Sequence, residues 1–141
     1  MALLSEAEQA AIKNQLEILT GPVKLINFGQ ELECQYCRET NQIAKELSQL
    51  SDKLSLETFN FVTDKTIADK YAIDKIPATI VMGQEDRGIR FYGIPSGYEF
   101  VSLLEAIKMV SSGQSGLSQK TKDIIGNLMA PLRIQVLVTP T

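Results

Sequence analysis

The cysteine content constrains this chain more than any other feature. Cys34 and Cys37 are the only two cysteines among 141 residues, and they stand three residues apart in the sequence Cys34-Gln35-Tyr36-Cys37. A disulfide that closes so short a loop restricts little of the unfolded chain, so a purely structural role explains the pair poorly. The chain contains no His, which excludes Cys–His nucleophilic catalysis, Ser–His–Asp triads and histidine metal sites.

The sequence around the pair indicates where it lies in the fold. The apolar run at 23–28 predicts a strand with both faces covered, and the periodicity that follows predicts a helix from about Tyr36 to Leu50. Unpaired N–H groups and the dipole at a helix start favour a thiolate. We therefore expect Cys34 to be the nucleophile of a disulfide exchange and Cys37 to be the more buried resolving thiol.

Two other interpretations of the pair stay open at this point. A CxxC pair can be half of a zinc site, but a closed site needs four ligands, so zinc would require two chains with their pairs facing each other. The pair can also be inert on a binding module. Apart from the redox-active Cys34–Cys37 disulfide itself, we expect no cofactor and no metal.

The remaining pattern predicts one α/β domain followed by a short extension. From residue 23 to 110 the predicted order is β-α-β-α-β-β-α, which is the order of a thioredoxin-like fold. We expect a domain at 1–112, which includes an extra N-terminal helix, and an extension at 113–141 with a linker, a helix and a strand. Ser5 with Glu8, and Ser96 with Glu99, match capping boxes. The other predicted elements are helices at 5–19, 64–71, 96–110 and 118–129 and strands at 54–62, 78–82, 89–92 and 132–138.

The dipeptide Ile76-Pro77 stands just before the third predicted strand. In this topology it lies opposite the helix that carries the cysteines, and a cis bond there would leave backbone groups free to pair with an incoming peptide. An ordinary trans proline at a strand's first residue is the alternative, but we expect the cis form. We expect Ile76, Pro77 and Tyr36 to bind the substrate, although Tyr36 has the alternative of merely covering apolar surface.

Charge and hydropathy restrict the partners. The 14 basic and 17 acidic residues give a net charge of −3, and the absence of a basic run argues against nucleic acid. The N-terminus has no basic start followed by an apolar stretch, and no apolar run approaches the about 20 residues of a membrane span. We therefore expect a cytoplasmic protein with neither nucleic-acid nor membrane partners.

Several motifs match a known family. The matching stretches read LECQYC, LSDKLS, IPAT and RFYGIPSGYEF, at 32–37, 50–55, 76–79 and 90–100. Together they resemble the N-terminal unit of the glutaredoxin-like protein disulfide oxidoreductases, which join two thioredoxin-fold units, each with its own CxxC pair. The segment 91–100 is also similar to the N-terminal domain of the flavoprotein that reduces alkyl-hydroperoxide peroxiredoxins. That relative has lost the pair in its first unit, whereas this chain keeps it.

The resemblance implies dithiol–disulfide exchange on protein substrates, and it carries over Cys34, Cys37 and Pro77. It implies a thioredoxin-reductase-like flavoenzyme as electron donor, while a glutathione-dependent reaction fits a two-cysteine site less well. It also implies that 133–141 is the first strand of a second unit that is missing or shortened. Because unpaired strands seek partners, we expect this strand to join a sheet, either its own or that of a second copy in a homodimer.

Proton transfer is where the sequence departs from the pattern. Thioredoxins place a buried Asp beneath the pair, and the corresponding residue here is Asn27, which cannot accept a proton. Glu31, Glu33 and Glu57 are the acids that could substitute, but we expect each to be solvated and assign none as the base. A thioredoxin-fold docking module without redox activity therefore stands as the competing function.

Overall fold

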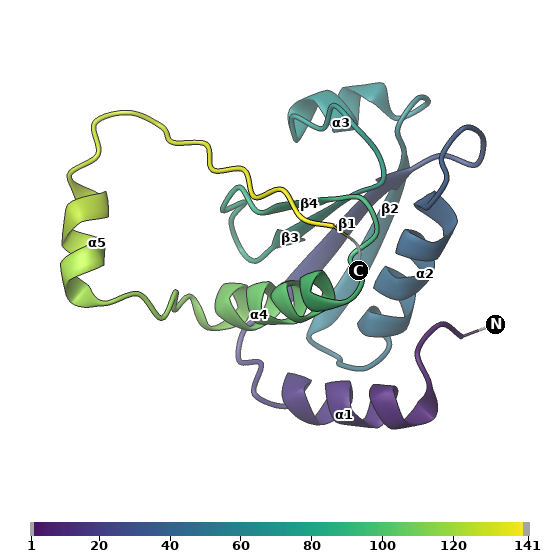
Figure 1. The fold of residues 1–141 in the computed structure, drawn as a ribbon, viewed down its shortest axis with the longest axis horizontal. Helices are drawn as coiled ribbons and strands as arrows, with labels where there is room; N and C mark the ends of the chain where they lie inside the picture. The colour runs from purple at the N-terminus through teal and green to yellow at the C-terminus, as the bar shows by residue number, and fades with distance from the viewer. Residues whose placement is uncertain (1, 140–141) are drawn as a thin grey trace.

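A four-stranded sheet forms the centre of the molecule (Figure 1). The structure, a computed structural model, describes residues 2–139. The strand order is β2-β1-β3-β4, in which β1 pairs with β2 in parallel and with β3 antiparallel, and β3 pairs antiparallel with β4. The strands are β1 (Val23–Gly29), β2 (Leu54–Asn60), β3 (Ala78–Met82) and β4 (Arg90–Tyr92).

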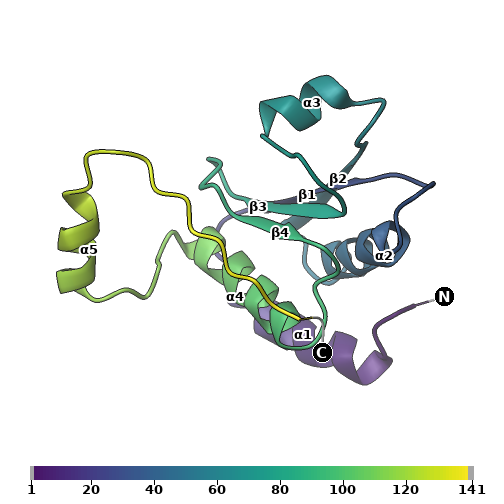
Figure 2. The ribbon, with the colours of Figure 1, turned by 45° about the horizontal axis from the view of Figure 1, so that its top comes forward.

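Helices cover both faces of this sheet. The helices are α1 (Glu6–Leu16), α2 (Cys37–Ser48), α3 (Lys65–Lys70), α4 (Tyr98–Ser112) and α5 (Gln119–Gly126). Figure 2 shows α1, α2 and α4 on one face of the sheet and the short α3 on the other, with α5 set apart from the body. The arrangement is the thioredoxin-like α/β fold that the sequence predicts. None of the helices in residues 2–139 is both long enough and apolar enough to cross a membrane.

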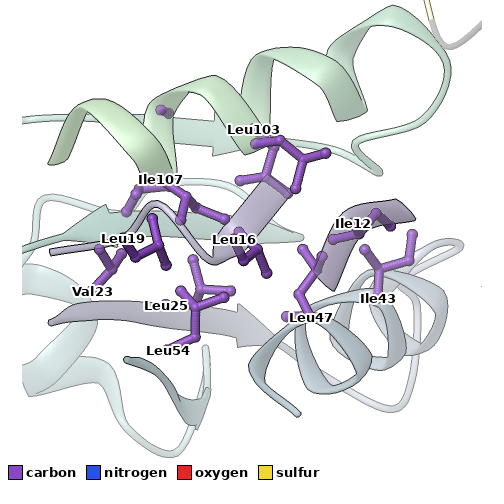
Figure 3. Packing of buried hydrophobic residues seen from close by; sticks show 14 residues of the cluster. Ile12, Leu16, Leu19, Val23, Leu25, Ile43, Leu47, Leu54, Leu103 and Ile107 are labelled. Carbon is purple, nitrogen blue, oxygen red and sulfur yellow. The ribbon is translucent and has the colours of Figure 1, made fainter. Parts of the chain in front are cut away.

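The central strand β1 supplies the core on both faces. Its side chains alternate, so that Val23 and Leu25 pack with α1, α2 and α4, whereas Ile26 and Phe28 pack with α3. The last three of these residues are fully buried. Figure 3 shows the larger cluster, in which α1 and α4 bring apolar side chains onto the first face. A strand buried on both faces explains the apolar run from which it was predicted.

The sequence predicts two capping boxes at helix starts, and the structure contains one of them. The capping box of α1 is confirmed, because the Ser5 side chain accepts from the Glu8 N–H and the Glu8 side chain accepts from the Ser5 N–H. The capping box predicted for α4 is wrong. Its N-cap is Gly97, with φ 61°, and no side chain caps the helix. A glycine reaches this left-handed backbone without steric cost, and the N-cap lies one residue later than the motif indicates, at Gly97 instead of Ser96.

The C-terminal prediction is half right. The helix is present as α5, and the Ser118 side chain caps it. The strand expected at 132–138 does not form, because these residues pair with no strand in the described chain. An apolar sequence alone cannot make a strand, which needs a neighbouring backbone for its hydrogen bonds. Pro140 and Thr141, which belong to the segment expected to form the strand, lie outside the described residues.

A buried carboxylate ties the N-terminal segment to the domain. Glu46 on α2 accepts from the Leu3 N–H at 2.7 Å, from the Leu4 N–H at 2.9 Å and from the Gln42 side chain at 2.7 Å. Burial acts to raise the pKa of Glu46, but these hydrogen bonds outweigh it, so the pKa is lowered. The segment that precedes α1 is therefore held by a charged group rather than by apolar packing alone.

Replacing this carboxylate is expected to make stability depend less on pH. Because the folded-state pKa of Glu46 is lowered, its stabilisation is present above the unfolded pKa of about 4.3 and is lost as pH falls through the folded value. Glu46→Gln should therefore lower the free energy of unfolding at pH 7 by about 1–3 kcal/mol. Urea denaturation at pH 7 and pH 3 measures this, with the exposed Glu17→Gln as control. An equal loss at both pH values would contradict the assignment.

Candidate active site

The two cysteines form a disulfide at the start of α2. Their Cα atoms are 5.5 Å apart. Cys34 lies in the turn before the helix and is half-buried, while Cys37 is only 4% exposed. The predicted difference in burial is therefore present. The helix begins at Cys37 itself, with Tyr36 as its N-cap, which is within one residue of the predicted start at about Tyr36.

The end of β1 forms the floor beneath the buried cysteine. A Cβ atom built on Gly29 would lie 3.2 Å from both Cβ and Sγ of Cys37. Few real Cβ contacts are so short, so the close approach of strand and helix at this point depends on a residue without a side chain. Sequence reasoning missed Gly29, although a glycine directly after an apolar strand and before the CxxC pair is a visible signal.

Pro77 lies next to this floor in the sheet. Phe28 pairs with Ala78, so the same register places Gly29 beside Pro77. The Ile76–Pro77 bond is cis, and the Pro77 carbonyl accepts from the Gly93 N–H at 2.8 Å. Pro77 is buried and Ile76 half-buried. Within residues 2–139 the backbone N–H and C=O of Ile76 make no hydrogen bond.

The loop that leads to the pair is exposed and carries a strained residue. Glu31 and Glu33 are exposed, and Leu32 between them is 79% exposed. Glu33, immediately before Cys34, has φ 56°, a left-handed backbone that costs a non-glycine residue about 1 kcal/mol. Nothing in the sequence marks this conformation, because the residue is not one of the types that adopt it readily.

Tyr36 lies between the two cysteines in the sequence and is the N-cap residue of α2. Its side chain is 42% exposed, and its hydroxyl accepts from the Gln35 side chain at 3.2 Å. Tyr36 therefore presents an exposed aromatic side chain two residues after Cys34. The three expected binding residues, Tyr36, Ile76 and Pro77, thus lie at the two segments that flank the disulfide.

None of the candidate acids lies beneath the pair. Glu57 binds Lys24 at 2.6 Å, and its register partner in β1 is Ile26, whose side chain is on the α3 face. That is the opposite face of the sheet from α2. Asn27, by contrast, is 1% exposed and lies on the α2 face, two residues before Gly29. The sheet beneath the cysteines therefore presents a neutral amide. Among the described residues, no group of three or more His, Cys, Asp and Glu side chains is arranged to hold a metal.

Fold and site together define a class. A thioredoxin fold with a disulfide between one accessible and one buried cysteine, at a helix start, is an arrangement for thiol–disulfide exchange. The accessible sulfur can meet a partner, and the buried sulfur is close enough to displace it. This chain therefore has a thioredoxin-like fold with a disulfide placed where thiol–disulfide exchange would need it.

Comparison with known proteins agrees with this class. The alkyl hydroperoxide reductase of Staphylococcus aureus (strain Mu50) has a component that is 26% identical over 132 residues, which are 92% of this chain and 23% of that protein. The NTD_N/C domain of the alkylhydroperoxide reductase AhpF of Enterococcus faecalis (V583) superposes with a TM-score of 0.75 at 27% identity, covering 86% of this chain and 59% of that one.

A further solved structure supports the fold. The protein disulfide oxidoreductase from Aeropyrum pernix K1 superposes with a TM-score of 0.83 at 24% identity, covering 91% of this chain and 56% of that one. No protein-family model matches the sequence. The chain spans less than a quarter of the length of the Staphylococcus relatives it matches.

Filling the floor at Gly29 is expected to destabilise the oxidised protein. In Gly29→Ala the new methyl group would press on Cys37, which the disulfide and the helix start hold in place, at a cost of about 1–3 kcal/mol. Gly126→Ala is the matched control, because a Cβ there would meet nothing within 4 Å. Urea midpoints of the oxidised proteins make the comparison. Equal midpoints for Gly29→Ala and the parent protein would contradict the prediction, because they would mean that strand and helix move apart at no measurable cost.

Proposed function

We propose that this chain is a protein disulfide oxidoreductase whose reacting groups are Cys34 and Cys37. The observation that carries the proposal is the asymmetric disulfide at the start of α2, with one half-buried sulfur and one buried sulfur. The similarity to a disulfide oxidoreductase and to components of hydroperoxide reductases supports it.

The proposed reaction is a pair of thiol–disulfide exchanges. The Cys34 thiolate attacks one sulfur of a substrate disulfide, forming a mixed disulfide and releasing the first substrate sulfur as a thiolate, which takes up a proton. Cys37 loses its proton and attacks the Cys34 sulfur, which releases the second substrate thiolate. Two electrons pass to the substrate, and the Cys34–Cys37 disulfide is restored. Run in reverse, the same steps introduce disulfides.

We assign substrate binding to the segments that flank the pair. The open N–H and C=O of Ile76 suit an extended substrate strand, which would pair there by main-chain hydrogen bonds. Pro77 holds this segment beside Gly29, and Tyr36 offers an aromatic surface for apolar groups next to the substrate sulfur. These roles are proposals that rest on position and on the absence of a backbone partner for Ile76 in the described chain.

The partners follow from the chemistry. Each turnover in the reducing direction leaves the pair oxidised, so a reductant must restore the two thiols. We propose a redox enzyme of the thioredoxin-reductase-like flavoprotein class for this step. A cytoplasmic location fits such a reducing system.

Removal of the nucleophile tests the function. In an insulin-reduction assay driven by dithiothreitol, the parent protein should accelerate reduction, and Cys34→Ser should return the rate to the uncatalysed background, because no thiol remains exposed to attack the substrate. Cys37→Ser is the matched variant; reduced first and then mixed with insulin after the dithiothreitol has been removed, it should accumulate a mixed disulfide with insulin, visible by mass spectrometry. Equal insulin-reduction rates for the parent protein and Cys34→Ser would favour the docking module without redox activity.

The C-terminal extension carries a second, separate proposal. Apolar side chains at 128–138 are exposed, Ile134 and Val136 each to 78%. We propose that this segment pairs with its counterpart in a second copy, because such pairing would satisfy its backbone and cover its apolar side chains.

Charge placed on this segment should disrupt the dimer. Light scattering coupled to size exclusion is expected to give a dimer for the parent protein, and a monomer for Ile134→Lys with Val136→Lys, because the lysines would be buried without partners in the paired strands. Ile18→Lys, at another exposed apolar site, is the control. A monomeric parent protein would contradict the proposal.

A further inference from the structure

A buried amide connects the cysteine helix to the proline strand. Asn27 donates from Nδ2 to the Ala78 carbonyl at 3.3 Å and to Thr79 Oγ1 at 3.2 Å, and its Oδ1 accepts from Asn41 Nδ2 at 3.1 Å. Ala78 and Thr79 begin β3, directly after Pro77, and Asn41 belongs to α2. One side chain on β1 therefore bonds both of the elements that bound the site. These three hydrogen bonds are called the Asn27 bridge below.

The orientation of the amide is fixed by its partners. The Ala78 carbonyl can only accept a hydrogen bond, so the nitrogen of Asn27 must face β3 and its oxygen must face α2. Asn41 then donates to this oxygen and also to Thr58 Oγ1, at 2.9 Å. Every polar atom of the Asn27 side chain has a partner, which a side chain with 1% exposure requires.

The bridge lies one layer beneath the reacting groups. Along β1, Asn27 and Gly29 are two residues apart and share a face, and along α2, Asn41 and Cys37 are four residues apart and share a face. Across the sheet, Asn27 pairs with Thr79, and the same register puts Gly29 beside Pro77. The bridge thus joins helix to strand one step below the place where Cys37 meets Gly29.

We propose that Asn27 is a positioning residue for exchange with protein disulfides. It holds α2 and the Ile76–Ala78 segment at a fixed separation, so that a substrate strand paired with the Ile76 backbone presents its sulfur to Cys34. The inference rests on the proposed function. It differs from a structural role, because it concerns the alignment of two elements that only a protein substrate uses together.

Substrates of different size distinguish a positioning role of Asn27 from a role in folding stability alone. A small neutral disulfide needs only Cys34 and Cys37, whereas a protein disulfide also needs the Ile76 backbone in place. Loss of the bridge should therefore leave the reaction with a small disulfide nearly unchanged. It should slow the reaction with a protein disulfide, because small misplacements of reacting groups lower the rate by large factors.

The experiment compares two second-order rate constants of the pre-reduced protein. The probes are insulin and hydroxyethyl disulfide, followed by stopped flow. Asn27→Ala should lower the ratio of the insulin rate constant to the hydroxyethyl disulfide rate constant by about 10-fold. Asn41→Ala and Thr79→Val each break one end of the bridge and should lower the ratio less, and they keep the test decisive if Asn27→Ala does not fold. Thr58→Val, which leaves all three bonds of Asn27 in place, should keep the ratio of the parent protein.

The outcomes are distinguishable from a failure of the proposed function. A parent protein that reacts with neither disulfide would remove the proposed function, and the inference with it. A reactive parent protein whose bridge variants lose both rates in equal proportion would overturn the positioning role alone. A ratio that falls in the bridge variants and holds in Thr58→Val supports it.

Discussion

The pairing of β1 on both of its edges is the constraint on which the rest of the structure depends. Its backbone is hydrogen-bonded to β2 on one side and to β3 on the other, so its register is fixed twice. A slip by one residue would turn Leu25 and Asn27 toward α3, and Ile26 and Phe28 toward α2. The register that avoids this also places Gly29 beside Pro77 and beneath Cys37. The geometry of the site is therefore a consequence of how the core strand is paired.

Most of the architecture could be predicted from the sequence, because apolar periodicity and local capping chemistry determine it. The run at 23–28 predicts β1, and Ser5 with Glu8 predicts the start of α1. The strand at 132–138 could not be predicted correctly, since an apolar pattern does not show whether a partner backbone exists. The predicted start of α4 is wrong because Gly97, with its left-handed backbone, is the N-cap in place of Ser96.

The sequence predicts the reacting residues of the site but not all of the residues that hold them in place. Cys34, Cys37 and Pro77 are visible because their types and spacing are unusual. Gly29 is marked in the sequence only by its place between an apolar strand and the CxxC pair. Asn41 acts through contacts that join distant parts of the chain, and no local pattern reports such contacts. The backbone of Glu33 is set by the loop that contains it, against the preference of its own residue type. The α2 face of β1 changes in character along the strand. Val23 and Leu25 lie in the larger apolar cluster, whereas Asn27 is hydrogen-bonded to α2 and Gly29 lies against Cys37.

The substrate contact that we propose for the Ile76 backbone has a consequence for selectivity. Amide and carbonyl groups are common to every residue except for the missing N–H of proline, so a main-chain contact recognises an extended shape without reading side chains. Under this proposal, discrimination among substrate proteins depends on exposed side chains near the cysteines in the sequence, which include Glu31, Glu33 and Tyr36. In such a protein, changes at a few peripheral residues would alter which substrate proteins bind, while Cys34, Cys37 and the Ile76–Pro77 segment stay the same.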